Sequence, residues 1–337
     1  MKELVVISGK GGTGKTSVVA AFASLASCKV LADCDVDAAD LHLVLAPEIR
    51  SRQEFLSGHE AVIRQEACIG CGACLANCRF GAVKQTSGSD ITWMFRATNA
   101  TCDDCDSCSR SCPSKAADMI KAMKEASGDS DRAAFAIDPI SCEGCGVCVD
   151  TCPAAAISFP ERVAGEWYIS DTRHGPMVHA RLGIAAENSG KLVTIVRQQA
   201  KAIAEQQQVA LILVDGPPGI GCPVIASITG ASLVLIVTEP TLSGEHDLRR
   251  VAELARHFRI PAYLCVNKWD INPSTTETVE KAAEGLGVKP LGRIRYDAAV
   301  TRAQVQGKSL VEFSENGAAA DVRGLWENVL SVLDDGE

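Results

Sequence analysis

The sequence predicts an α/β fold, with a doubly wound and mostly parallel sheet interrupted by a smaller inserted domain. A buried strand at residues 3–7 passes through a glycine-rich loop into a helix, and strands alternate with helices again in the second half of the chain. The segment 61–160 lacks this alternation. Alternating strands and helices are typical of a parallel sheet covered by helices on both faces. We therefore expect a discontinuous α/β domain at 1–60 and 161–337, with residues 61–160 looped out as an insert.

The individual elements follow from apolar runs and glycines. The strand at 3–7 is too continuously apolar for a half-exposed strand, so we expect it inside the sheet. Glycine-rich residues 9–14 separate it from a helix at about 15–26. The remaining expected elements, in chain order, are a strand at 29–32, a helix at 190–207, strands at 210–215 and 233–238, a helix at 244–258 and a strand at 262–266.

The composition excludes some classes of protein. The 337 residues are 47% hydrophobic and carry a formal charge of -9, with a pI near 5.3. This chain is long enough for one large core and one smaller domain. Nonspecific nucleic-acid binding depends on Lys and Arg, so the acidic balance argues against it. The sequence shows no apolar leader and no run of about 18 apolar residues. We expect a cytoplasmic protein without a membrane span.

The glycine-rich loop matches the Walker A pattern, which binds nucleotide phosphates. It lies between a predicted strand and a predicted helix, as the pattern requires. Its backbone N–H groups and the helix N-terminus attract phosphate oxygens, Lys15 would neutralise charge and Thr16 would ligate Mg²⁺. An ordinary glycine-rich turn is the alternative. The pattern begins with Gly9 and Lys10, and the residues expected to bind ATP are Gly11, Gly12, Thr13, Gly14, Lys15, Thr16 and Ser17.

A second lysine inside this loop, Lys10, resembles the deviant Walker A motif of the MinD/ParA/nitrogenase iron protein family. The resemblance implies an ATP-linked homodimer in which Lys10 reaches across to the partner's phosphates and acts, with Lys15, in catalysis. A merely solvated lysine is the alternative. The resemblance continues through residues 30–35, which are similar to the family's switch region.

Four aspartates follow the strand at 29–32. The resemblance implies that Asp35 orients the attacking water and that Asp33 lies near the Mg²⁺ shell. The alternative is that such aspartates cap a helix or form a turn. We prefer this alternative for Asp37 and Asp40.

Two further motifs complete the resemblance, which covers roughly residues 1–60 and 165–310. Asp215 follows four apolar residues and looks like a Walker B aspartate that holds Mg²⁺. The Pro-Pro-Gly sequence after it is similar to the Mrp-type iron-sulfur carrier ATPases. Asn267 and Asp270 lie where the family contacts adenine. The resemblance implies slow, Mg-dependent ATP hydrolysis that serves as a switch.

Cysteine is unusually frequent, and 12 of the 16 cysteines form three runs of identical spacing. The first and third runs have the C-x2-C-x2-C-x3-C spacing of bacterial ferredoxins, in which the fourth cysteine crosses to the other cluster. Paired cysteines can also bind zinc, which is the alternative. Arg79 stands where the usual pattern has proline. We predict one 4Fe-4S cluster on Cys68, Cys71, Cys74 and Cys152, and another on Cys142, Cys145, Cys148 and Cys78.

The middle run is harder to interpret. Its residues are acidic in context and lack the glycines of the flanking runs. It could hold a third cluster by itself, exchange a ligand with a neighbour, bind zinc or hold no metal, and spacing does not decide among these. Its ligands would be Cys102, Cys105, Cys108 and Cys112.

The four scattered cysteines are Cys28, Cys34, Cys222 and Cys265. We expect Cys28, Cys34 and Cys265 to be small buried residues. For Cys222 we favour burial over a role in which it lends a thiolate to a transient cluster at a dimer interface.

Together these motifs suggest an ATPase that couples its nucleotide state to electron transfer or to iron-sulfur and metal cofactor assembly on a redox or cluster-acceptor protein. A cluster carrier or scaffold, and a positioning switch with purely structural clusters, are the alternatives. MinD proper ends in a basic amphipathic membrane helix, whereas the last helical segment here is acidic. We therefore expect no membrane partner and no nucleic-acid partner.

Overall fold

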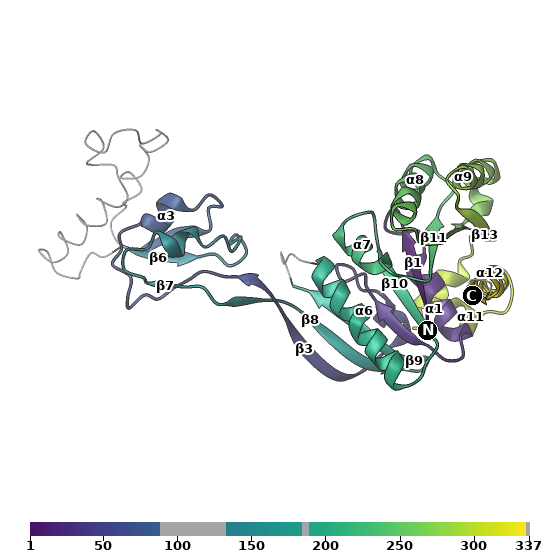
Figure 1. Ribbon diagram of the computed structural model, residues 1–337, viewed down its shortest axis with the longest axis horizontal. Coiled ribbons are helices and arrows are strands. Elements are labelled where there is room, and N and C mark those ends of the chain that lie inside the picture. The colour runs from purple at the N-terminus through teal and green to yellow at the C-terminus, as the bar shows by residue number, and fades with distance from the viewer. Residues whose placement is uncertain (88–132, 184–188, 335–337) are drawn as a thin grey trace, which may run out of the picture. The chain divides into compact units, whose positions relative to one another are not determined.

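The computed structural model describes residues 1–87, 133–183 and 189–334 (Figure 1). They divide into two compact units. One, here called the sheet unit, comprises Met1–Phe55 and Gly165–Glu337, and the other, the cysteine unit, comprises Leu56–Ala164.

The sheet unit contains a large, mostly parallel sheet, so its α/β class is as the sequence predicts. Strands β13, β12, β11, β1, β10, β2 and β9 lie side by side in this order and run parallel. β8 pairs antiparallel with β9, and β3 completes the nine-stranded order. The strands are β1 (Lys2–Ser8), β2 (Val30–Asp33), β3 (Glu48–His59), β8 (Glu161–Thr172), β9 (Gly175–Leu182), β10 (Leu211–Pro218), β11 (Leu233–Thr238), β12 (Ala262–Asn267) and β13 (Lys289–Ile294).

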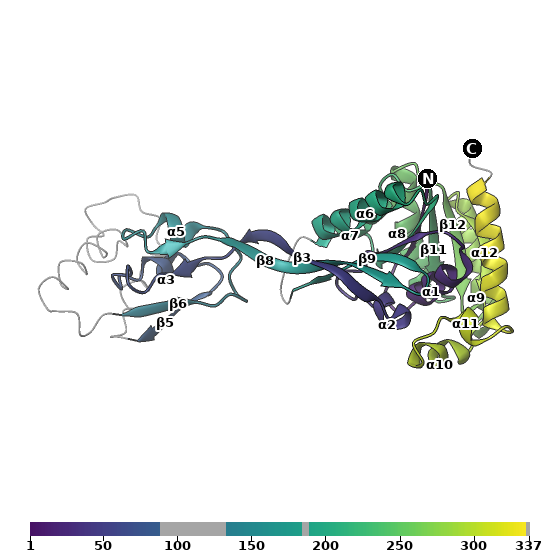
Figure 2. The same ribbon diagram turned by 90° about the horizontal axis from the view of Figure 1, so that it is seen from below.

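Helices cover both faces of this sheet (Figure 2). One face carries α1 (Lys15–Leu25), α2 (Leu41–Leu45), α10 (Ala299–Val305), α11 (Leu310–Phe313) and α12 (Ala318–Asp334). The opposite face carries α6 (Ser189–Gln206), α7 (Cys222–Ile228) and α8 (Leu242–His257), and α9 (Pro273–Gly285) packs against α8, β12 and β13. A short 3-10 helix, η3 (Trp269–Ile271), follows β12.

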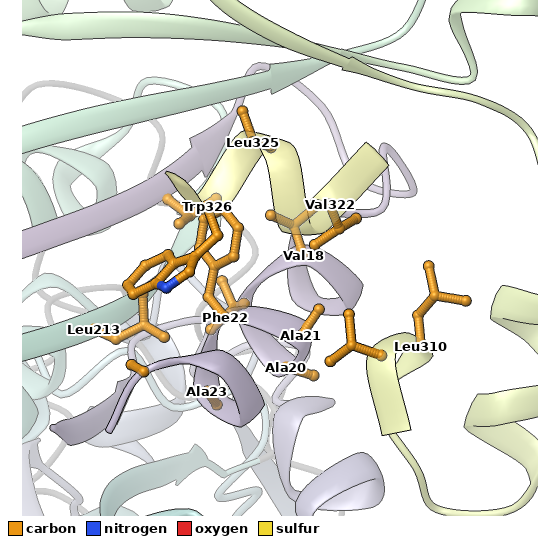
Figure 3. Packing of buried hydrophobic residues seen from close by; sticks show 14 of the residues in the cluster. Val18, Ala20, Ala21, Phe22, Ala23, Leu213, Leu310, Val322, Leu325 and Trp326 are labelled. Atoms are coloured by element: carbon orange, nitrogen blue, oxygen red, sulfur yellow. The ribbon is translucent and has the colours of Figure 1, made fainter. Parts of the chain in front are cut away.

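The core under α1 and α12 explains why the central strands are apolar on both sides. Every residue of β11 is buried, as expected for a strand with helices on both faces. Phe22 of α1 and Trp326 of α12 pack with ring centroids 4.8 Å apart (Figure 3). Truncating either ring to alanine would cost about 3–5 kcal/mol, which is a large fraction of the stability of a typical domain.

The cysteine unit repeats one short pattern twice. A strand, a four-cysteine run, a short helix and a second strand occur first as β4 (Val62–Ile63), α3 (Ala73–Asn77) and β5 (Val83–Ser87). They occur again as β6 (Ala134–Ile137), α5 (Val147–Asp150) and β7 (Ile157–Ser158). β4 pairs with β7 and β5 with β6, both antiparallel, so each repeat completes the sheets of the other.

No described helix in either unit combines the length and apolar character needed to cross a membrane.

Candidate functional site

The Walker A loop lies at the carboxyl ends of adjacent parallel strands, where open α/β sheets bind ligands. Two of its glycines have backbone conformations that L side chains rarely adopt, with φ 79° at Gly12 and 88° at Gly14. A Cβ at Gly14 would also lie 2.3 Å from the Asn267 amide nitrogen. Gly14 is the N-cap of α1, so these glycines let the loop turn directly into the helix.

A cavity of about 400 Å³ opens over this loop. It brings together all seven residues from Gly11 to Ser17, with Asp35 and Asn267. Lys10, Asp33, Asp215 and Asp270, which the sequence also placed in the site, are not among the described residues that line it. The other lining residues are Ser8, Val18, Ala38, Asp40, Pro218, Lys268, Ile294, Arg295, Tyr296, Asp297, Val300, Thr301, Gln304, Leu310 and Val322.

Buried charges surround the Lys15 ammonium at the base of this cavity. Lys15 Nζ lies 2.5 Å from Asp215 Oδ1 and 3.3 Å from Asp35 Oδ2. Burial alone would lower the pKa of Lys15, but Asp215 and Asp35 outweigh it, and the pKa lies above its ordinary value. Lys15 is therefore a fixed positive charge, which suits phosphate binding.

Asp33 and Asp215 lie opposite each other in the β2–β10 pairing, and both are fully buried. Burial, together with the charge of Asp215, raises the pKa of Asp33 well above its usual range. Each carboxylate keeps one Oδ2 atom without a hydrogen-bond partner among the described residues, as does the Thr13 hydroxyl. Carboxylate oxygens are preferred Mg²⁺ ligands, so this donor set fits the ion that the sequence predicts.

The far wall of the cavity was not predicted. Arg295, Tyr296 and Asp297 come from the segment after β13, which also ends at this edge of the sheet. Asp270 Oδ1 accepts a hydrogen bond from the Tyr296 backbone N–H at 2.7 Å, so Asp270 positions this wall. Asn267 Nδ2 donates to the Thr13 carbonyl at 2.7 Å. The rule that parallel strands present ligands at their carboxyl ends was the available signal for this wall.

Asp40 also lines the cavity. It occupies the N-cap position of α2, in keeping with the cap or turn preferred from the sequence, although its side chain makes no capping hydrogen bond. The loop from Asp33 to α2 thus brings Asp40 to the cavity as well, which the sequence did not predict.

Lys10 points away from the cavity of its own chain. Its ammonium donates to Ser243 Oγ at 3.2 Å and lies 3.4 Å from Glu239 Oε2. Its side chain is 32% exposed. Within one chain, the Lys10 ammonium is therefore paired with two residues that do not line the phosphate site. Its backbone carbonyl accepts from the Ser8 hydroxyl of that site at 2.8 Å.

The cysteine unit contains two cavities lined by thiols from both outer runs. The first cysteine cavity is lined by Cys68, Cys71, Cys74 and Cys152, and the second by Cys142, Cys145, Cys148 and Cys78. Each cavity is about 20 Å³, room for a single water, so a larger group would require the thiols to stand further apart. No three described His, Cys, Asp or Glu side chains converge closely enough to hold a single metal ion.

Backbone N–H groups and left-handed glycines surround these thiols. Gly70 N donates to Cys68 Sγ at 3.4 Å, and Ala156 N donates to Cys152 Sγ at 3.3 Å. The tight turns within the two runs use positive φ at Gly70, Gly72, Gly144 and Gly146. These turns direct backbone dipoles at sulfur.

The two cysteine cavities differ in burial. Cys71 and Cys74 are 7% and 8% exposed, whereas Cys145 is exposed. Burial raises the pKa of Cys74 to about 12. Burial would also raise the pKa of Cys78, but backbone N–H groups around residues 80–83 outweigh it and hold the pKa below its ordinary value.

The four cysteines outside the runs divide into two buried and two exposed side chains. Cys34 and Cys265 are buried as predicted, but Cys28 and Cys222 are exposed, and their predicted burial was wrong. Cys28 lies in the turn between α1 and β2, and Cys222 is the first residue of α7, where side chains face outward. The middle run, Cys102 to Cys112, lies outside the described residues.

The chain belongs to the family described as the CobQ/CobB/MinD/ParA nucleotide binding domain (CbiA), whose pattern matches residues 4–311. This is a family of P-loop ATPases with the large, mostly parallel sheet seen here. ATP and Mg²⁺ are the ligands expected of its MinD-like members.

Among individual proteins, the chain is similar to the uncharacterized protein MJ0578 of Methanocaldococcus jannaschii, at 30% identity over 80% of this chain and 79% of that one. Its fold is similar to the septum site-determining protein MinD complexed with Mg-ADP from Pyrococcus horikoshii, with TM-score 0.53, 15% identity and coverage of 100% and 98%. It is also similar to the MinC:MinD cell division protein complex of Aquifex aeolicus, with TM-score 0.51, 16% identity and coverage of 98% and 96%.

Proposed function

We propose that the protein is an ATP-hydrolysing iron-sulfur protein, in which an ATP-linked homodimer couples the nucleotide state to electron delivery to a partner protein. In this proposal residues 61–160 form a ferredoxin-like insert that carries two 4Fe-4S clusters. The observation that carries the proposal is the crossing of the outer cysteine runs. Each cysteine cavity takes three thiols from one run and the fourth from the other.

This crossing is the ligand arrangement of bacterial two-cluster ferredoxins. It follows from the repeated architecture, because the pairing of β4 with β7 and of β5 with β6 brings the fourth cysteine of each run beside the other run. A tetrahedral zinc ion needs its ligands to converge on one atom. A cubane instead takes one thiolate on each of four irons, so four thiols that share a cavity without meeting at one point, with backbone N–H donors nearby, suit it better.

The nucleotide half of the proposal rests on the P-loop cavity. Lys15 would bind the phosphates, Thr16, Asp33 and Asp215 would hold Mg²⁺, and Asp35, at the cavity wall, would orient the attacking water. Mg²⁺ would supply charge neutralisation on the phosphate oxygens. The structure of Pyrococcus horikoshii MinD with Mg-ADP supports nucleotide binding by this fold.

The dimer and the partner are also part of the proposal. Lys10 lies outside its own cavity, which suits a lysine that serves the phosphates of a second copy. The MinC:MinD complex shows that a protein of this fold can act with another protein. A redox protein or cluster acceptor would be the partner here.

The proposal is tested by anaerobic purification and by counting iron and sulfide per chain. The expected result is about eight irons, or about twelve if the middle run also binds a cluster, retained through cycles of reduction and reoxidation. The count is repeated with MgATP and an apo-acceptor protein, where loss of about four irons to the acceptor would indicate a cluster carrier instead. Cys28→Ser is the control, since this cysteine is exposed and outside the runs. Stoichiometric zinc without sulfide would contradict the proposal.

A further inference from the structure

One acidic side chain, Glu239, links Lys10 to a residue of the nucleotide cavity. Glu239 Oε2 lies 3.4 Å from Lys10 Nζ, and Glu239 Oε1 accepts from Lys268 Nζ at 2.6 Å. Lys268 lines the P-loop cavity, whereas Lys10 does not. The Glu239 side chain is 15% exposed, and its two carboxylate oxygens are shared between the two lysines.

The local backbone fixes Glu239 in this position. It follows β11 directly, and its carbonyl accepts from Thr241 N at 2.8 Å. Thr241 caps α8 by accepting from Gly244 N. A Cβ at Gly244 would lie 2.3 Å from the Glu239 carbonyl oxygen, so the turn admits only glycine there. The Ser243 hydroxyl that also accepts from Lys10 belongs to the same turn.

We propose that Glu239 is a positioning residue that holds Lys10 on its own subunit and releases it to the phosphate of a second copy. This inference rests on the ATP-linked homodimer of the proposed function. Release is cheap because Glu239 keeps its shorter ion pair with Lys268 after Lys10 leaves, so no buried carboxylate loses its only partner. A phosphate carries more charge than one shared carboxylate and wins the competition when it arrives.

The test compares Glu239→Gln with wild type by sedimentation in a nonhydrolysable ATP analogue. Glutamine keeps the shape and an acceptor oxygen but loses the charge that competes for Lys10. The ATP-dependent dimer is expected to tighten by about threefold, the scale of one exposed ion pair. Glu245→Gln is the matched control, because Glu245 pairs with Arg249 on α8 at 2.8 Å and contacts neither lysine. The affinity of the monomer for the analogue is measured alongside, because Glu239→Gln also removes the ion pair of Lys268, which lines the cavity.

A second measurement does not require a dimer. In the nucleotide-free protein, acylation of the Lys10 amine relative to Lys2 is followed by mass spectrometry and is expected to rise in Glu239→Gln. A wild-type protein that stays monomeric with the analogue would refute the proposed homodimer, while the labelling would still decide whether Glu239 holds Lys10. Unchanged labelling, or an unchanged or weaker dimer in a protein that does dimerise, would overturn the inference.

Discussion

The P-loop cavity and the cysteine cavities prepare for their ligands by opposite means. Around Lys15, charges are already in place and paired with one another, and the cavity has about 400 Å³ of space. In the cysteine unit the thiols lie in small apolar cavities of about 20 Å³, and burial raises the pKa of Cys74 to about 12. Under the proposed function, cluster binding there would remove thiol protons and move the thiols apart, which would link binding to folding. The first site is preformed, and the second would be completed by the proposed ligand.

Iron removal should give the largest difference between the two units. Stripping iron anaerobically with a chelator is expected to unfold the cysteine unit, whose sheets have only two strands each, while the nine-stranded sheet stays intact. Amide hydrogen exchange would show protection lost by at least about 100-fold in β5 and β6 and unchanged in β1 and β10. Equal protection in the cysteine unit before and after chelation would mean that its fold does not depend on metal.

Lys15→Ala tests whether the P-loop cavity binds its ligand through charges that are already in place. It removes the charge that faces phosphate and leaves Asp215 and Asp35 buried without their cation, which costs about 3–5 kcal/mol. ATP affinity measured by calorimetry should fall by at least about 100-fold, with iron content unchanged. Lys10→Ala is the control, and it should keep monomer ATP affinity because Lys10 does not line the cavity. Iron loss in Lys15→Ala would show that the two units are not independent.

Acid should lower the free energy of unfolding of the sheet unit, through protonation of His179 in β9. Burial, followed by the neighbouring His42, lowers the pKa of His179 to about 4 from an ordinary 6.5. As pH falls, the unfolded chain takes up this proton first. The contribution is therefore fully present above about pH 6.5 and is lost progressively down to about pH 4, by up to about 3 kcal/mol.

This pH dependence is measured by denaturant unfolding of the sheet unit. His179→Phe keeps a ring against Tyr168, whose centroid lies 4.9 Å away, and removes the titrating group. It should reduce the gain in stability with rising pH between 4 and 6.5, and it removes the hydrogen bond at 2.9 Å between His179 and the Ser170 hydroxyl. The raised pKa of Asp33 contributes the opposite slope, so the variant is compared with wild type. His246→Gln, which replaces a 73% exposed side chain, is the control. A His179→Phe profile with the wild-type slope in this range would refute the assignment.

The sheet and the phosphate loop could be predicted because their signals are local. Continuous apolar runs such as 233–238 and the Walker A spacing specify their own structure. The strands β3, β8 and β9 were missed, because β3 and β8 mix exposed and buried residues and β9 joins the parallel sheet through β2, which is distant in the sequence. β-propensity depends on such context.

The sites divide along the same line. Residues of the Walker A loop could be placed by sequence, whereas Arg295, Tyr296 and Asp297 reach the cavity only through the fold. The exposure of Cys28 and Cys222 was missed because free cysteines are usually buried in proteins. Their exposure depends on their positions in a turn and at the start of a helix, which only the structure provides. The thiols that line each cysteine cavity are the four that the ferredoxin spacing assigns to one cluster, and the binding of a cluster there stays a prediction.

The smallest expected effect separates the two cysteine cavities from each other. In the iron-loaded protein, the second cysteine cavity should release its iron to air or chelator several-fold faster than the first, by about one order of magnitude at most. The reason is that Cys145 of the second cavity is exposed, whereas Cys71 and Cys74 of the first are buried. The loss is followed by absorbance and iron counting. Cys145→Ser should accelerate only the fast phase and Cys71→Ser only the slow one. A single phase of iron loss in wild type, changed equally by both variants, would contradict this prediction. It would mean that both proposed clusters are lost together when the cysteine unit unfolds.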